Sequence, residues 1–124
     1  MSDYASRRIS EAELSVMEAL WDTGAAMTAK DLQTAKDLQV LLKERRGWER
    51  TTVRSLLTRL QEKGSVQVDK DADVATYAPN FTREEYGWDL AEVLVDRLYD
   101  KDARTLVTTL IAHGMLKKED LAGL

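Results

Sequence analysis

Residues 51–64 limit the possible folds more than any other part of this chain, because they predict a short amphipathic helix that ends at a glycine. Thr51 or Thr52 can cap its first turn, and Gly64 follows its last residue, as is typical of a helix C-terminus. Its apolar side chains recur at the i, i+3, i+4, i+7 spacing that forms one stripe along a helix: Val53, Leu56, Leu57 and Leu60. The helix is therefore expected to bury one face and expose the other.

The exposed face of this predicted helix carries small hydroxyl side chains between arginines. Thr51, Ser55 and Thr58 occupy its centre, and Arg54 and Arg59 lie on its two flanks. Small hydroxyls allow a helix to approach closely in a DNA major groove, and arginine can reach phosphates or guanine edges. The pattern indicates a DNA-recognition helix or, alternatively, an ordinary amphipathic helix with a solvated polar face.

The segment after the glycine predicts a β-hairpin. Residues 65–69 and 74–78 alternate between apolar and polar side chains, residues 70–73 form a polar turn, and Pro79 ends the second run. A helix followed by a hairpin is the second half of a winged helix-turn-helix, in which the hairpin is the wing. The predicted fold is mainly α with a small β-hairpin wing, and such modules bind either DNA or proteins.

Basic side chains are concentrated around the predicted helix. The whole chain has a net charge of −4, whereas residues 41–63 hold seven basic and three acidic side chains, a net charge of +4. This distribution is typical of a protein that meets phosphates with one face only. The basic side chains are Lys43, Arg45, Arg46, Arg50, Arg54, Arg59 and Lys63.

Several function classes are disfavoured by what the 124 residues lack. There is no cysteine for a thiolate metal site or a disulfide, no apolar run long enough to cross a membrane, and no signal-peptide core. His113 is the only histidine, and it is expected to lie at a helix C-terminus next to Gly114 rather than in a catalytic set. We therefore expect a cytoplasmic protein that is not an enzyme and has no metal or other cofactor.

The N-terminal part of the chain predicts two further helices. Ser10 and Glu13 form a capping box for a helix that continues to Gly24, with Trp21 as a packing residue. A six-residue sequence then occurs twice, at 28–33 and 34–39. Because Leu38, Leu41 and Leu42 form a coherent stripe, the second copy is expected to start the next helix, which runs to Arg46. The first copy is expected to lengthen that helix or to form a linker.

The C-terminal part predicts helices with large apolar faces. Thr82 and Glu85 form a capping box for a helix to about Asp100, and further helices are expected over 103–111 and 118–124. These helices have more apolar surface than they can hide from water among themselves, so a homodimer is expected. The expected dimerisation residues are Trp88, Ala91, Leu94, Val95, Leu98, Leu106, Val107 and Leu110.

Motifs along nearly the whole chain occur in the order found in a known family. They are Ile9-Ser10-Glu11-Ala12-Glu13, Val16-Met17-Glu18, Leu20-Trp21, Gly47-Trp48, Thr51-Thr52-Val53-Arg54-Ser55-Leu56-Leu57, Arg59-Leu60, Lys63-Gly64, Tyr77-Ala78-Pro79 and Arg83-Glu84-Glu85-Tyr86. In these motifs the chain resembles the penicillinase repressor (BlaI/MecI/CopY) family of winged-helix transcriptional regulators.

The resemblance implies a homodimeric transcriptional repressor with a DNA-binding domain at residues 1–80 and a helical dimerisation domain at 81–124. It also implies a double-stranded, two-fold symmetric operator with TACA/TGTA-like half-sites. Together with the basic cluster, it gives the expected DNA-contact residues: Arg50, Thr51, Thr52, Arg54, Ser55, Thr58, Arg59 and Lys63.

The sequence departs from the family pattern in four places. The repeat adds length to the second predicted helix, and the wing tip at 71–74 is acidic where relatives usually carry Gly-Arg. Thr108-Thr109-Leu110 stands where protease-relieved members carry an Asn–Phe bond, and the cysteine cluster of copper-responsive members is missing. The inducing signal and any upstream sensor therefore stay open.

Two alternatives to this prediction also stay open. The acidic wing and the negative net charge favour a winged-helix module that binds protein without sequence-specific DNA binding. A repressor with a small-molecule pocket between its two domains is the other.

Overall fold

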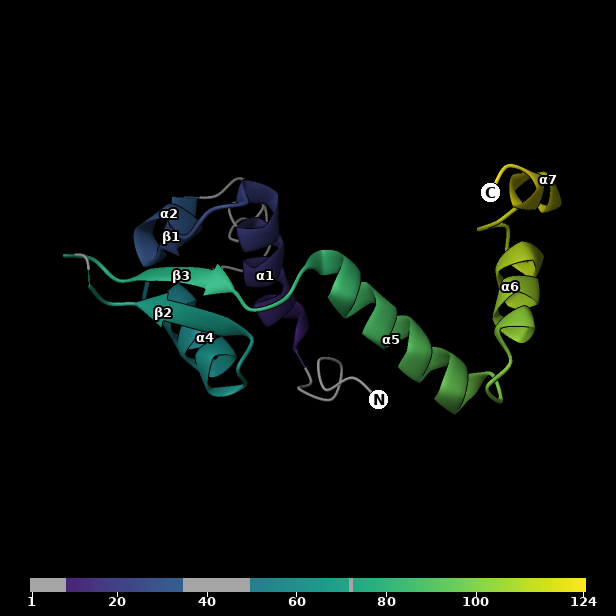
Figure 1. The fold of residues 1–124 in the computed structure, drawn as a ribbon, viewed down its shortest axis with the longest axis horizontal. Helices are drawn as coiled ribbons and strands as arrows, with labels where there is room; N and C mark the ends of the chain where they lie inside the picture. The colour runs from purple at the N-terminus through teal and green to yellow at the C-terminus, as the bar shows by residue number, and fades with distance from the viewer. Residues whose placement is uncertain (1–8, 35–49, 72) are drawn as a thin grey trace. The chain divides into compact units, whose positions relative to one another are not determined.

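The computed structural model describes residues 9–34, 50–71 and 73–124, and its chain divides into two compact units, Met1–Tyr86 and Gly87–Leu124. Figure 1 shows the elements in chain order. They are α1 (Glu11–Thr23), β1 (Met27–Thr28), α2 (Ala29–Thr34), α4 (Arg50–Glu62), β2 (Val66–Asp69), β3 (Thr76–Pro79), α5 (Arg83–Leu98), α6 (Ala103–Ala112) and α7 (Lys118–Ala122). The predicted mainly α fold with a small hairpin is confirmed.

Helix α1 begins and ends as predicted. The Glu13 backbone N–H donates to Ser10 Oγ at 3.1 Å, and the Ser10 N–H donates to Glu13 Oε1 at 2.9 Å, which completes the capping box. Gly24 adopts a left-handed φ of 70° and ends the helix. Trp21 packs against the core, as expected, and its indole N–H donates to the Phe81 carbonyl at 2.9 Å.

Helix α2 begins at Ala29, in the first copy of the repeat, which was expected to lengthen the next helix or to form a linker. Most of the second copy, residues 35–39, lies outside the described residues. Thr28 is responsible for the start at Ala29, because its Oγ1 accepts from the Asp31 N–H at 3.0 Å while its own N–H donates to the Asp31 carboxylate at 3.2 Å. Leu32 is fully buried and ties this copy to the core. The stripe predicted at Leu38, Leu41 and Leu42 lies outside the described residues.

Helix α4 is the predicted recognition helix, and its C-terminal end is confirmed. Gly64 has a φ of 75°, its N–H donates to the Gln61 carbonyl, and the Ser65 N–H donates to the Leu60 carbonyl. This is a Schellman motif. The predicted cap at Thr51 or Thr52 is wrong, because the helix already begins at Arg50 and both threonines lie inside its first turn.

The three strands form one antiparallel sheet in the order β1-β3-β2. The predicted hairpin of β2 and β3 is confirmed, with Val68 opposite Tyr77 in its register. Strand β1, which sequence analysis missed, pairs Met27 with Tyr77. A two-residue strand has too little periodicity to be predicted, and its pairing with β3 alone defines it.

The core of the first unit is made by the apolar faces of α1, α2, α4 and β2. The stripe predicted on α4 is buried throughout, as are Phe81 and Tyr86 from the segment after β3. The buried core residues are Val16, Met17, Ala19, Leu20, Met27, Ala29, Leu32, Val53, Leu56, Leu57, Leu60, Val66, Phe81 and Tyr86.

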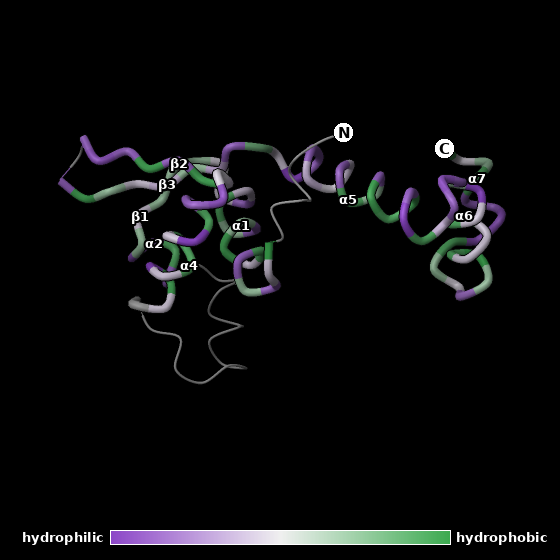
Figure 2. Tube along the Cα trace, turned by 90° about the horizontal axis from the view of Figure 1, so that it is seen from below, coloured by the Kyte–Doolittle hydropathy of each residue, from purple (hydrophilic) through white to green (hydrophobic). Residues whose placement is uncertain are grey.

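Helices α5, α6 and α7 follow with the predicted signals at their ends. The Thr82 and Glu85 capping box is present, with both hydrogen bonds at 3.0 Å. Asp102 caps α6 and His113 lies at its C-terminus, before Gly114. Hydrophobic and hydrophilic residues alternate along α5 in Figure 2, and α6 and α7 contain no buried residue. Among the described helices, none combines the length and hydropathy that a membrane span requires.

The predicted domain boundary after residue 80 differs from the division into compact units. The first unit continues to Tyr86, because Phe81 and Tyr86 pack with Trp21. The division therefore falls within α5 and not before it.

Candidate nucleic-acid interface

The polar face of α4 is open to solvent. Arg54, Ser55, Thr58 and Arg59 are all exposed, opposite the buried stripe of the same helix, and Thr52 is half-buried. The Thr58 hydroxyl donates to the Arg54 carbonyl at 2.9 Å, which orients the hydroxyl oxygen along the helix. The side chains of Arg50 and Thr51 lie outside what the structure describes. Four of the predicted contact residues therefore share one accessible surface.

This surface continues into a hollow between α2, α4 and the start of β3. The hollow has a volume of about 470 Å³. Lys30 and Arg54 provide cations from two different helices, while the wing residues that line the hollow are uncharged. Its lining residues are Ala29, Lys30, Arg54, Thr58, Val74, Ala75 and Tyr77. A concave surface with two cations beside a helix face is suited to binding the phosphate backbone of a nucleic acid.

The wing tip has the opposite charge. Asp69, Asp71 and Asp73 are all exposed, and the Asp71 N–H donates to the Asp69 carboxylate at 2.9 Å. Lys70 is the one basic side chain of this turn. Negative charge at the exposed tip is unfavourable for contact with phosphates.

Lys63 has a different environment from the other predicted contact residues. Its Nζ lies 2.6 Å from Oε1 of Glu13, in a hydrogen-bonded ion pair that joins the end of α4 to the first turn of α1. The lysine side chain is 31% exposed and the glutamate only 2%. Sequence analysis missed this partner because Glu13 is fifty positions away and has a complete local role as a cap.

The pKa of Glu13 reflects these contacts. Burial acts to raise it, but hydrogen bonds from Lys63 and from Ser10, with the lysine charge, outweigh burial and hold the pKa of Glu13 below its ordinary value. The Glu13 carboxylate is therefore charged at neutral pH, although its side chain is almost fully shielded from water. Burial and then the charge of Glu13 raise the pKa of the neighbouring Tyr86.

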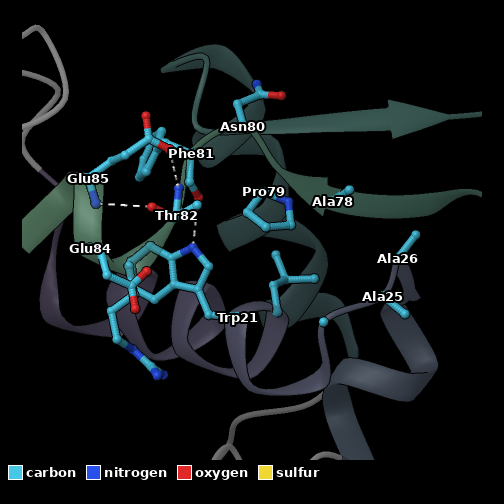
Figure 3. A pocket seen from close by; sticks show the side chains of 13 residues that line it. Trp21, Ala25, Ala26, Ala78, Pro79, Asn80, Phe81, Thr82, Glu84 and Glu85 are labelled. Carbon is cyan, nitrogen blue, oxygen red and sulfur yellow. Dashed lines mark hydrogen bonds between the residues drawn. The ribbon is translucent and has the colours of Figure 1, made fainter.

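A second hollow, also of about 470 Å³, lies where the chain leaves the wing (Figure 3). Trp21 forms one wall, and its ring centroid is 6.3 Å from that of Phe81. The Arg83 guanidinium lies 5.6 Å from the Trp21 ring centroid and 2.6 Å from Asp22. All the lining residues belong to the first unit, Met1–Tyr86.

Within the described ranges, no three histidine, aspartate or glutamate side chains gather closely enough to hold a metal ion.

Comparison with known proteins supports the predicted resemblance. The family model described as Penicillinase repressor matches residues 9–124. The penicillinase repressor of Bacillus licheniformis is 25% identical over 114 residues, which are 92% of this chain and 84% of that protein. The methicillin resistance regulatory protein MecI of Mammaliicoccus sciuri is 25% identical over 120 residues, 97% of this chain and 88% of that protein.

Two solved structures are similar to part of the chain. The solution structure of the DNA binding domain of the repressor BlaI is 29% identical, covers 64% of this chain and 89% of that chain, and has a TM-score of 0.49. The solution structure of the Bacillus licheniformis BlaI monomeric form in complex with the blaP half-operator is 28% identical, covers 64% and 88%, and has a TM-score of 0.47. From the family match over residues 9–124, this chain belongs to the penicillinase repressor family, a family of transcriptional repressors and not of enzymes.

Proposed function

We propose that this protein is a homodimeric transcriptional repressor that binds a two-fold symmetric DNA operator through α4. The observation that carries the proposal is the exposed face of α4, with Arg54, Ser55, Thr58 and Arg59 beside the hollow that Lys30 also lines. One such helix lies in the major groove of each half-site. Bound protein then excludes RNA polymerase from an overlapping promoter.

The roles of the contact residues follow from their chemistry. Arg54 and Arg59 hold phosphates or guanine edges, and Ser55 and Thr58 are small enough to lie against base edges. Arg50, Thr51 and Thr52 in the first turn complete the proposed set, because the first turns of a recognition helix enter the groove most deeply. The acidic wing makes little contact with phosphates in this proposal.

The second unit supplies the proposed dimer interface. Trp88 is 66% exposed and Leu98 is 73% exposed, and Leu94 is also exposed on the same helix. Apolar side chains so accessible within the unit favour a partner, and an identical copy gives the two-fold symmetry that a palindromic operator requires. The proposed interface residues are Trp88, Ala91, Leu94, Val95, Leu98, Leu106, Val107 and Leu110.

A winged-helix module that binds protein instead of DNA is the second candidate, and the exposed acidic wing tip is the observation that favours it. Fluorescence anisotropy with a palindromic TACA/TGTA duplex and a scrambled duplex, each at several salt concentrations, separates the two. A repressor prefers the palindrome, and its affinity falls steeply with salt. Equal, weak binding to both duplexes would favour the protein-binding module.

To locate the contact surface, we compare Arg54→Gln/Arg59→Gln with Lys117→Gln/Lys118→Gln, which removes the same charge from the C-terminal end. The first pair is expected to abolish the preference for the palindrome and the second to leave it unchanged. Equal effects of both pairs would mean that only net charge matters.

A further inference from the structure

Lys63, the residue that follows α4, forms an ion pair with the buried carboxylate of Glu13. Glu13 uses Oε1 for both of its described hydrogen bonds, from the Ser10 N–H at 2.9 Å and from Lys63 Nζ at 2.6 Å. Its second oxygen, Oε2, is buried and has no hydrogen-bond donor among the described residues. The lysine ammonium is therefore the cation that compensates this buried carboxylate.

The position of the pair couples it to the orientation of α4. Lys63 is the last residue before Gly64, which ends α4, and Glu13 lies in the first turn of α1. Between these two helices, apolar side chains such as Leu57 and Val16 form a core that fixes their distance. Apolar packing is non-directional, whereas a hydrogen-bonded ion pair at one end of a helix fixes its register and angle more narrowly.

Removal of the lysine charge leaves the Glu13 carboxylate buried without a cation. Such a carboxylate must either take up a proton or gain access to water, and access requires the end of α4 to move away from α1. A small tilt of a recognition helix displaces its exposed side chains from the base edges, although contacts with the flexible phosphate backbone persist.

We propose that Lys63 is a positioning residue for DNA recognition, which acts through Glu13 to fix the angle of α4, and that it is not a phosphate contact. This inference rests on the proposed function of α4 as the recognition helix. It replaces the sequence-based expectation that Lys63 binds DNA directly.

The test compares four full-length variants on the TACA/TGTA and scrambled duplexes: Lys63→Met, Lys63→Arg, Glu13→Gln/Lys63→Met and Arg59→Met. Methionine keeps the aliphatic length of lysine without its charge. Glutamine keeps the acceptor that the Ser10 N–H needs, but removes the buried charge. Thermal melting of each variant sets a temperature at which every protein is fully folded, so that affinity differences do not reflect unfolding.

Three results are expected. Lys63→Met loses about tenfold in affinity for the palindrome, the equivalent of one weakened base contact, and keeps its affinity for the scrambled duplex and its salt dependence. Lys63→Arg retains the preference. Glu13→Gln/Lys63→Met recovers most of it, because no buried charge is left without a partner.

A phosphate contact gives the opposite pattern. The slope of log affinity against log salt would then fall by about 0.9 per protomer in Lys63→Met, as it does for a lost phosphate contact, and both duplexes would be affected equally. Glu13→Gln could not restore a lost phosphate contact, so failure of the double variant to recover would overturn the inference. Arg59→Met shows the size of a direct-contact effect on the same helix. If the wild-type protein has no preference for the palindrome, the proposed function fails, and the inference fails with it.

Discussion

The two units of this protein differ in how far their apolar side chains are buried. In the first unit, the apolar stripes of α1 and α4 are buried, with Val16, Leu20, Leu57 and Leu60 fully so. In the second unit, Trp88, Leu98 and Met115 are 66%, 73% and 79% exposed. Both regions are helical and similarly amphipathic in sequence, so amphipathicity alone does not decide whether a helix completes its core within one chain.

The difference indicates that the two units have different functions. A unit with a fully buried core can hold a recognition helix rigidly, which base contacts require, whereas a unit with exposed apolar side chains gains stability by association. We expect the first unit to determine which DNA is bound and the second to determine how many copies bind it.

The largest expected effect is a difference between the two units in how much a leucine-to-alanine substitution lowers the free energy of unfolding. Leu57→Ala removes a fully buried side chain and is expected to lower the free energy of unfolding by about 3 kcal/mol, because it leaves a cavity. Leu98→Ala in the exposed face is expected to cost less than about 1 kcal/mol in protein diluted to the monomeric state. Urea denaturation of both variants measures this. Equal losses would show that the second unit has a closed core as well.

A charge in the exposed face is expected to give the next largest effect. Leu98→Asp places a carboxylate in the proposed dimer interface, and loss of the dimer removes the avidity of two linked recognition helices. Palindrome affinity is then expected to fall by about 100-fold. Sedimentation velocity reports the oligomeric state and anisotropy the affinity, with Glu92→Lys, on the same helix, as a control for charge change. A dimer that survives Leu98→Asp would place the interface elsewhere.

On the recognition face, single arginine variants are expected to act more weakly. Arg59→Gln removes an exposed side chain and should lower palindrome affinity by about tenfold without changing the melting temperature. Anisotropy titrations with DNA at several salt concentrations show whether the lost contact was to a phosphate, since only then does the slope of log affinity against log salt decrease. An unchanged affinity would remove Arg59 from the contact set.

A smaller effect is expected at the cap of α1. Ser10→Ala removes the acceptor for the Glu13 N–H and should lower the free energy of unfolding by about 1 kcal/mol. Ser10→Thr, which keeps a hydroxyl, is the matched control and should lose less. The same loss in both variants would mean that the cap contributes no hydrogen-bond energy.

The smallest expected effect is a pH dependence that belongs to the first unit. The pKa of Glu13 is lowered by folding, so the stability it contributes is complete above its unfolded pKa and is lost as pH falls through the folded value. Thermal melting between neutral and acidic pH should therefore show a smaller decline in Glu13→Gln than in the wild type. Parallel declines would indicate that other carboxylates account for the acid sensitivity.

Local signals in the sequence predicted much of this fold. The capping boxes at Ser10 and Thr82 and the glycine at position 64 depend on contacts within a few residues, so their patterns are visible in the chain itself. The stripe of α4 was equally predictable, because its periodicity is strict. Membership of the penicillinase repressor family followed from motifs that span nearly the whole chain.

The features that the sequence did not predict depend on distant partners. Strand β1 exists because Met27 pairs with Tyr77, and the partner of Lys63 lies in another helix. The burial of Leu32 in the first copy of the repeat likewise depends on packing against the rest of the core. The exposed polar face of α4 was predicted from the spacing of its side chains, but the contact between Lys63 and Glu13 forms only in the packed core.

Light scattering on the full chain mixed with the TACA/TGTA duplex measures how many chains each duplex holds. A dimeric repressor of a two-fold symmetric operator is expected to give two chains on one palindromic duplex, a single chain on a duplex with one half-site, and no stable complex on the scrambled sequence. One chain per palindrome, or equal complexes on palindromic and scrambled DNA, would show that the protein does not bind a symmetric operator as a dimer.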